Sequence, residues 1–304
     1  MAMTHLDRFP EEGFGLSALA PRVGPFPMAG FLQAWWEELA PDARMIIISD
    51  GSGALPLMET EGVIRFLGES DLTDYHSPLG RDIEGPVSVL AKMVDHTITL
   101  DLDSLPGEAA TAIAEVLMST GLRPKTSEQT VARVLHLPSS VDEYHGLIGK
   151  KERHELRRKR RRYEEQVGPG ILRTDIGPGF GFDEFVRLHR LAPGEKGTFM
   201  TAARYRFFSR LCGQDGWRVD YLENDGAATA CLFGWTDGSD YYLYNSSFDP
   251  ALQSASPGQV LLAGMIEHAI TEGWGVFDFL KGDESYKARL GAVPRQLFRI
   301  EASR

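Results

Sequence analysis

The sequence predicts an α/β protein of the mixed α+β kind. It is organised as two similar halves, each with a mixed, mostly antiparallel sheet flanked by helices. Three observations support this class. Apolar residues recur at helical spacing in several segments, and short β-rich runs stand between those segments. Asp-Gly pairs at 225–226 and 237–238 favour tight hairpins. The 304 residues are enough for two domains of ordinary size, expected here at 1–138 and 139–304.

The first half alternates helices with strands. In 28–39 the apolar residues from Phe31 to Leu39 have the spacing of one helix face. The short aliphatic run at 44–49, "RMIIIS", predicts a buried strand. The other elements expected in this half are strands at 53–60, 62–68, 97–102 and 130–137, and helices at 85–96 and 105–121.

The second half repeats the plan without a direct sequence repeat. Hairpins come first and a strand–helix–strand stretch follows, so the predicted sheet is mixed and carries helices. The helices expected are 140–167, 181–192, 201–214, 258–272 and 283–291, and the strands are 170–176, 217–225, 227–237, 240–249, 275–280 and 295–303.

Charge is unevenly distributed along the chain. The net formal charge is −11, yet "KKERHELRRKRRR" at 150–162 carries nine Lys and Arg against two Glu. Removing that local +7 leaves −18 on the rest of the chain, which disfavours general binding to nucleic acid or membranes. The N-terminus has no signal-peptide pattern, and no aliphatic run is long enough to span a bilayer. Cys212 and Cys231 form no C-x-x-C pair, so a cytoplasmic protein without a metal site is expected.

The most informative stretch is "SSFDPALQSASPGQVLLAGMIEHA" at 246–269. A polar strand end runs into small residues, and Ser256-Pro257-Gly258 then opens an aliphatic helix. The first turn of a helix leaves backbone N–H groups unpaired and carries a partial positive charge. Small residues there let an anion approach closely. The plainer alternative is that the three residues only cap a core helix.

This stretch resembles the GNAT acyltransferases, which carry Q/R-x-x-G-x-G/A at the start of the helix after their fourth strand. Here the pattern is Gln253 to Gly258, with Ser256 in place of one glycine. The following strand "VFDFL" and "YKARLGA", similar to the family's Tyr-x-x-x-x-Gly segment, strengthen the resemblance. The whole stretch is similar to a branch with two tandem GNAT-like domains, which includes cellulose-biosynthesis-associated and Fem-like acyltransferases.

The resemblance implies an acyl-CoA co-substrate, acetyl-CoA or another acyl-CoA, bound by the second domain. The helix start would hold the pyrophosphate through backbone N–H groups, and the edge of the preceding strand would pair with the pantetheine arm. The first domain, which has no such pattern, is expected to be a degenerate half. The residues implied in cofactor binding are Asn245, Ser246, Ser247, Gln253, Ser256, Gly258, Gln259 and Val260.

The implied reaction is direct attack of an amine on the thioester, which requires no protein nucleophile. Tyr286 matches the tyrosine that protonates the leaving thiolate in the family, although it could instead pack under the sheet. Asp278 and Asp249 are the candidates for the base. Asp278 lies mid-strand between apolar neighbours, which also fits helix capping or an ion pair with Lys281 or Lys287.

Candidate acceptor-binding residues come from several segments. The polar, turn-rich run at 68–80 is expected to face the cleft between the domains, although a solvated loop is an equal alternative. His189 lies on a predicted helix before Gly-Glu-Lys-Gly, a segment that could form a mobile rim. The full acceptor-binding set is Asp74, Tyr75, His76, His189, Lys281 and Lys287.

The basic segment at 150–162 has three interpretations. It could be a solvated helix buried only along Leu156 and Tyr163, a surface for an anionic acceptor or the CoA 3′-phosphate, or an RNA-binding element. The function expected is transfer of an acyl group, in particular acetyl, from acyl-CoA to an amine of a small-molecule or envelope precursor. The alternatives are a Fem-like aminoacyltransferase that uses aminoacyl-tRNA, and a non-catalytic GNAT-like binding protein.

Overall fold

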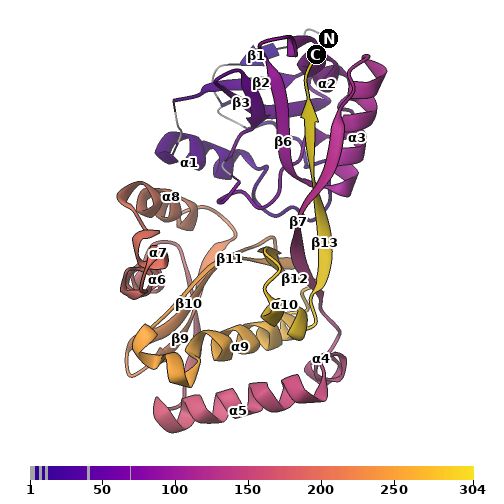
Figure 1. Ribbon diagram of the computed structural model, residues 1–304. Coiled ribbons are helices and arrows are strands. Elements are labelled where there is room, and N and C mark those ends of the chain that lie inside the picture. The colour runs from indigo at the N-terminus through magenta and orange to yellow at the C-terminus, as the bar shows by residue number, and fades with distance from the viewer. Residues whose placement is uncertain (1–3, 7–8, 11–12, 40–41, 69) are drawn as a thin grey trace. The chain divides into compact units, whose positions relative to one another are not determined.

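Figure 1 shows the computed structural model, which describes residues 4–6, 9–10, 13–39, 42–68 and 70–304. The chain divides into two compact units. The first comprises Met1–Ala132 together with Arg295–Arg304, and the second comprises Arg133–Pro294. The chain therefore passes from one unit to the other twice. The units differ from the predicted domains in that residues 295–304 group with the first unit, and the predicted boundary after residue 138 stays a prediction.

The first unit contains a mixed sheet in the order β1-β2-β3-β4-β6-β13, with β5 paired to β3. All neighbours along this order are antiparallel except β4 and β6, which are parallel. The elements are β1 Thr4–Leu6, α1 Ala29–Leu39, β2 Arg44–Ser49, β3 Gly53–Thr60, β4 Val63–Phe66, β5 Leu79–Gly80, α2 Glu84–Met93, β6 Thr99–Pro106, α3 Gly107–Ser119, β7 Lys125–His136 and β13 Val293–Ala302. The last two strands cross the boundary, because residues 133–136 and 293–294 belong to the second unit.

The second unit places its strands in the order β12-β11-β10-β9-β8. The first pair is parallel and the other pairs are antiparallel. The elements are α4 Val141–Leu147, α5 Lys150–Gln166, β8 Ile171–Ile176, α6 Phe180–Leu191, α7 Glu195–Thr198, α8 Ala202–Cys212, β9 Trp217–Asn224, β10 Ala227–Thr236, β11 Asp240–Phe248, the 3₁₀ helix η1 Pro250–Ala255, α9 Pro257–Thr271, β12 Val276–Lys281 and α10 Ser285–Arg289.

The sheet of the second unit is covered on both faces (Figure 1). Leu232 of β10 packs with residues of α9, while its neighbour Phe233 meets rings from α6 and α8. This alternation follows from the two-residue period of a strand. The predicted turn at 225–226 joins β9 to β10, and both residues have positive φ, 48° and 78°, as a type I′ turn requires.

The predicted helix 140–167 is wrong as a single element, because the chain breaks into α4 and α5. Ile148 and Gly149 are extended, with ψ near 150°. The Arg153 guanidinium stabilises the break by donating to the backbone oxygens of His145 and Ile148, each at 2.7 Å. These carbonyls end α4 and lack helical partners, so an arginine one turn into α5 satisfies them.

Candidate functional site

Two parallel strands separate at the centre of the second unit. The pairing of β11 with β12 runs from Asp240↔Val276 to Tyr242↔Asp278, whereas β11 continues to Phe248. Opposite β10 the register of β11 shifts after Leu243, which leaves Tyr244 as an extra residue. A bulge of this kind bends a strand and interrupts its ladder. Residues 243–248 therefore form a strand segment on which β12 no longer adds hydrogen bonds.

The first turn of α9 follows directly after this segment and η1. Ser256 has φ 57° and ψ 47°, a left-handed conformation that residues other than glycine seldom adopt. Its carbonyl accepts from the N–H groups of Gln259 and Val260 at 3.1 and 3.2 Å, and its own N–H donates to Gln253. Pro257 has no N–H. Of the backbone N–H groups of Ser256, Gly258, Gln259 and Val260, only that of Gly258 lacks an acceptor among the described residues.

A cavity of about 390 Å³ lies between the open part of β11, the first turn of α9 and Tyr286 of α10. It contains six of the eight predicted cofactor-binding residues. Its lining consists of Lys196, Cys231, Leu232, Leu243, Ser246, Ser247, Phe248, Gln253, Ser256, Pro257, Gly258, Gln259, Leu262 and Tyr286. The lining combines apolar side chains with serine and glutamine side chains and with backbone groups of the α9 turn. The structure therefore brings the predicted strand edge, helix start and tyrosine to one cavity.

Tyr286 is the predicted acid that lines this cavity. It lies on α10, half-buried, with its ring 6.4 Å from that of Phe279 in an edge-to-face arrangement. Burial, with a smaller effect from the nearby Glu284 carboxylate, raises the pKa of the phenol to about 12. A phenol with this pKa stays protonated at neutral pH, so it can donate a hydrogen bond to negative charge that develops beside it.

Lys196 is a cavity residue that the sequence interpretation missed. It lies on α7, within the Gly-Glu-Lys-Gly segment that was interpreted only as a rim. Its ammonium is 5.5 Å from the centre of the Phe248 ring, and desolvation there lowers its pKa. No carboxylate pairs with it among the described residues. A Cβ built on Gly258 would lie 3.6 Å from the same Phe248 ring, so Phe248 is a neighbour of both Lys196 and Gly258.

The two predicted bases do not line the cavity. Asp249 caps η1 and accepts from the N–H of Ala251 at 2.9 Å. Asp278 is 1% exposed, and its carboxylate accepts from the N–H of Leu280 at 2.8 Å. Leu280 has a positive φ of 59°, so Asp278 stabilises an unusual backbone turn at the end of β12. Their role as base stays a prediction.

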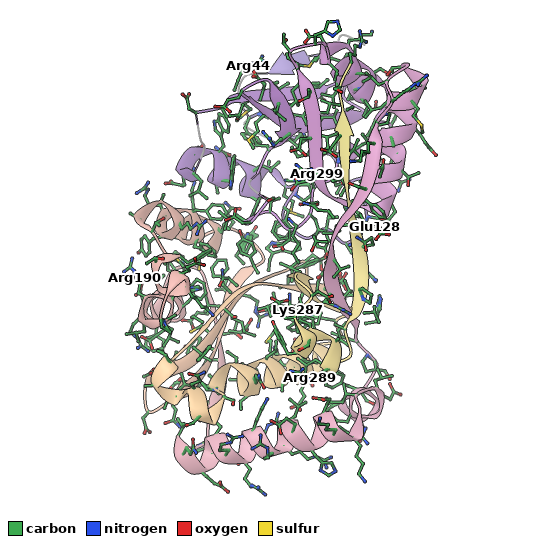
Figure 2. The ribbon with its side chains drawn as sticks, in the orientation of Figure 1. Arg44, Glu128, Arg190, Lys287, Arg289 and Arg299 are labelled. Atoms are coloured by element: carbon green, nitrogen blue, oxygen red, sulfur yellow. The ribbon has the colours of Figure 1, made fainter. Side chains whose placement is uncertain are left out.

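The predicted lysines also have structural contacts. Lys287, labelled in Figure 2, is 3% exposed, and its ammonium donates to the carbonyl of Lys281 at 2.7 Å. The same ammonium lies 2.9 Å from the carboxylate of Glu284. These contacts close the loop between β12 and α10. Lys287 thereby positions Tyr286, its neighbour on α10, and its predicted contact with an acceptor remains untested.

His189 and Asn245 form a pair beside the cavity rather than within its lining. The His189 Nε2 and the Asn245 Oδ1 are 2.7 Å apart, and the imidazole stacks on Phe199 with ring centres 5.3 Å apart. His189 is 2% exposed, and burial lowers its pKa, so the neutral imidazole is favoured. The pair links α6 to β11 near the bulge. Its arrangement fits a packing role for both residues.

The acceptor-binding residues predicted at 74–76 lie in the first unit. Tyr75 is fully buried, with the Arg295 guanidinium 5.0 Å from its ring centre, and Asp74 is half-buried. The 68–80 segment is therefore largely buried rather than a solvated loop, although Glu69 lies outside the described residues. The binding of an acceptor by these residues stays a prediction.

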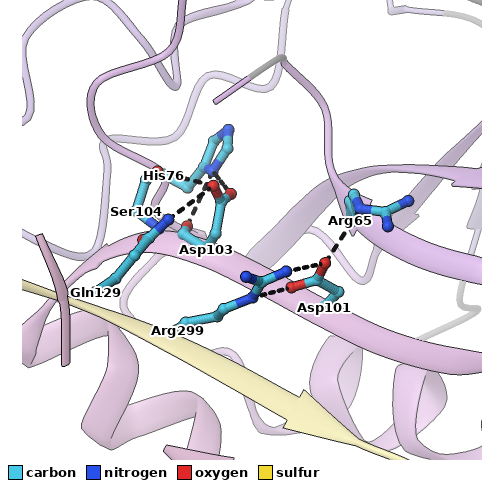
Figure 3. A network of polar contacts seen from close by, with 7 residues as sticks. All are labelled: Arg65, His76, Asp101, Asp103, Ser104, Gln129 and Arg299. Carbon is cyan, nitrogen blue, oxygen red and sulfur yellow. Dashed lines mark hydrogen bonds and ion pairs between the residues drawn. The ribbon is translucent and has the colours of Figure 1, made fainter. Parts of the chain in front are cut away.

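Figure 3 shows the polar network that contains His76. The His76 Nδ1 lies 3.0 Å from both the carboxylate and the backbone oxygen of Asp103. Since both partners are acceptors, the proton resides on Nδ1. Asp103 also accepts from Ser104 and Gln129. Beside it, Asp101 pairs with Arg65 and Arg299. These contacts satisfy charged groups that would otherwise be costly to bury.

The basic helix α5 packs along α9 in the second unit (Figure 1). Tyr163 is buried and Leu156 partly buried against the core, as the first of the three interpretations predicted. Its cations are largely engaged: Arg160 pairs with Glu267 at 2.8 Å, and Arg162 donates to the Ser254 carbonyl at 3.0 Å. Lys159 donates to the Gln259 side chain, in the first turn of α9. This helix therefore borders the candidate site.

Within the described residues, no group of three or more His, Cys, Asp or Glu side chains is arranged to hold a metal ion. None of the helices in that part of the chain is long and apolar enough to cross a membrane.

Comparison with known proteins defines the class. Residues 150–288 match the family model described as an acetyltransferase (GNAT) domain, and all of them lie in the second unit. This part of the chain is therefore similar to the GNAT acyltransferases, the family that the sequence resemblance indicated. The match includes the open strand β11, the α9 turn and Tyr286. A comparison of the sequence with curated proteins finds no match.

Solved structures extend the likeness to nearly the whole chain. L-PGS from Bacillus licheniformis is 15% identical, with 93% of this chain and 94% of that one covered and a TM-score of 0.62. FemX is 11% identical, with 94% of this chain and 93% of the FemX chain covered and a TM-score of 0.59. A tandem GNAT protein from the clavulanic acid biosynthesis pathway is 15% identical, with 99% of this chain and 98% of that chain covered and a TM-score of 0.50. The predicted fold, two tandem GNAT-like domains, is confirmed.

Proposed function

We propose that the protein is an N-acyltransferase that moves an acyl group, in particular acetyl, from acyl-CoA to a primary amine of a small-molecule or envelope precursor. One observation carries the proposal. Inside the GNAT segment, a single cavity is lined by the part of β11 beyond its pairing with β12, by the first turn of α9 and by Tyr286. This arrangement offers a strand edge, a helix start that can bind an anion and a proton donor within one cavity.

The residues present fit the chemical parts of an acyl-CoA. Amide groups of the pantetheine arm can pair with the open backbone of residues 243–248, as an added strand would. The Gly258 N–H and the positive end of the α9 dipole favour the pyrophosphate. Lys196, which has no carboxylate partner among the described residues, adds a positive charge to the same cavity.

When bound, acyl-CoA would supply a thioester whose carbonyl carbon is attacked by the amine as the C–S bond breaks. Tyr286 would hold the proton that the leaving sulfur needs, because its phenol remains protonated and lines the cavity. The proton of the attacking nitrogen would pass to a base, for which Asp278 and Asp249 remain candidates. No covalent link to the protein is required.

The test is calorimetric titration of the full chain with acetyl-CoA. Gly258→Glu would place a carboxylate beside the pyrophosphate and is expected to abolish binding. Gly258→Ala is the matched control, because the added Cβ would make an ordinary contact with Phe248 at 3.6 Å. A wild-type chain that does not bind acetyl-CoA, or a Gly258→Glu variant with unchanged affinity and an intact fold, would remove the assignment.

A further inference from the structure

The strand at the end of the sheet in the second unit, β8, pairs on one side only. It is the last strand in the order, and its partner is β9, in a register that runs from Ile171↔Glu223 to Ile176↔Arg218. Four of its six residues are exposed. The backbone groups of β8 that point away from β9 have no hydrogen-bond partner among the described residues. An edge of this kind can pair with a further strand.

This edge carries large apolar side chains and has sharp limits. The side chain of Ile176 is 82% exposed and that of Ile171 is 50% exposed. The strand is flanked on both sides by Gly-Pro-Gly, at 168–170 and 177–179. Proline has no N–H to donate to a ladder, and Gly168 and Gly177 have positive φ, 112° and 85°. A strand that pairs with this edge is therefore confined to the six residues of β8.

Two opposite charges lie on one face of β8, two positions apart. Arg173 donates through Nε to Glu223 at 2.9 Å, while its two terminal amino groups have no hydrogen-bond acceptor among the described residues. The Asp175 carboxylate accepts from the Gly181 N–H at 2.6 Å and from the Tyr221 hydroxyl at 3.3 Å. Both groups can form further hydrogen bonds, because a guanidinium has five donors and a carboxylate about four acceptor positions.

We propose that β8 pairs antiparallel with β8 of a second copy of this chain, about a two-fold axis at Thr174. Opposite residues of an antiparallel pair share a face, so in a symmetric pair one residue lies on the axis, opposite its own copy. Only axes at Arg173 and at Thr174 let five residues of each strand pair. An axis at Arg173 places like charges opposite each other. An axis at Thr174 instead places Arg173 opposite Asp175 of the second copy, twice by symmetry.

The same register matches the apolar side chains on the other face. It places Leu172, which packs against the core beneath α9, opposite the exposed Ile176 of the second copy. Charges on an edge strand discourage pairing with other strands, but here they complement an antiparallel copy of the same strand. The charges therefore favour a second copy as the partner. Because five residues bury little surface, the dimer is expected to be weak, with a dissociation constant in the micromolar range.

The experiment is sedimentation velocity of the full chain over a concentration series that spans the micromolar range. Wild type is expected to change from monomer to dimer. Arg173→Asp should raise the dissociation constant at least about tenfold, because two cross-strand pairs change from attractive to repulsive. Ile176→Lys should also weaken the dimer, because it replaces the apolar contact with a charge. Both side chains are at least half exposed, so both variants are expected to fold, which thermal unfolding would check.

Two variants serve as controls. Glu223→Gln removes the partner of Arg173 within the chain and should not weaken the dimer. Leu147→Lys places a lysine at another exposed apolar position of the second unit, on α4, and should dimerise as wild type does. A wild type that stays monomeric throughout would overturn the inference and leave the edge to a different partner. Folded Arg173→Asp and Ile176→Lys variants that dimerise as tightly as wild type would overturn it as well.

Discussion

At the residue scale, the candidate site depends on backbone groups as much as on side chains. The helix start offers one free N–H at Gly258, because Ser256 is left-handed and Pro257 has no hydrogen to donate. The side chains that complete the cavity come from separate elements: Lys196 from α7, Phe248 from β11 and Tyr286 from α10. The three side chains can act on one ligand only because the fold brings them to the same cavity.

Tyr286→Phe tests the proton donor. The substitution removes the hydroxyl but keeps the ring packed on Phe279, so acyl-CoA affinity should be unchanged. Loss of a positioned acid should lower kcat by about 10²-fold. The raised pKa, about 12, further predicts that activity in the wild type shows no loss from tyrosine ionisation below about pH 10. Steady-state kinetics with acetyl-CoA would check both; a wild-type kcat in the variant would assign Tyr286 to packing alone.

At the scale of elements, α5 is held by its neighbours more than its composition suggests. Six of the nine Lys and Arg side chains in 150–162 have partners within the second unit: Arg153, Arg158, Lys159, Arg160, Arg161 and Arg162. Most of these contacts are exposed and individually weak. Those of Lys159 and Arg160 reach α9, and together with the narrow apolar stripe of Leu156 and Tyr163 they hold the helix along α9.

This arrangement predicts that the protein does not bind tRNA appreciably at physiological ionic strength. Binding of an RNA backbone needs several free cations, and the rest of the chain carries −18. A filter-binding titration with bulk tRNA at two salt concentrations would check this, with acetyl-CoA titrated beside it. Micromolar binding that weakens steeply with salt and disappears on combined Lys150→Ala and Arg157→Ala substitution would contradict it and favour an aminoacyl-tRNA donor.

At the scale of the whole molecule, the chain order and the compact units do not coincide. Strand β13 begins at Val293 and pairs with β6 of the first unit, so the C-terminus belongs with the N-terminal part of the chain. The strands of both units belong to one mixed sheet, and each unit has buried apolar residues of its own. Both units also contain polar contacts on their surfaces and in their interiors.

Several of those contacts hold carboxylates ionised, which makes stability depend on pH. Hydrogen bonds from Arg158 are the largest effect that lowers the pKa of Glu155, to about 2, and Arg187 lowers that of Glu184. The backbone N–H of Gly62 does the same for Glu59. Because the folded pKa values lie below the unfolded ones, the stabilisation is complete above about pH 5 and is lost as the pH falls toward 2.

Thermal unfolding followed at pH 7, 5, 4 and 3 should therefore show a midpoint that is nearly constant down to pH 5 and then decreases. Glu184→Gln removes one of the contributing carboxylates and should flatten the decrease while it lowers the midpoint at pH 7. A midpoint that stays constant to pH 3 in the wild type would show that these contacts add nothing to stability.

The sequence alone determined the local structure. Apolar periodicity located most helices and strands, the Asp-Gly pairs located hairpin turns, and the small residues before 258 located the helix start, because each signal acts over a few neighbouring residues. Only the tertiary structure decided where β11 and β12 separate, that Lys196 reaches Phe248, that Arg153 divides the basic helix from α4, and that β13 joins the first unit. These features depend on register and on contacts between distant segments, which local patterns do not specify.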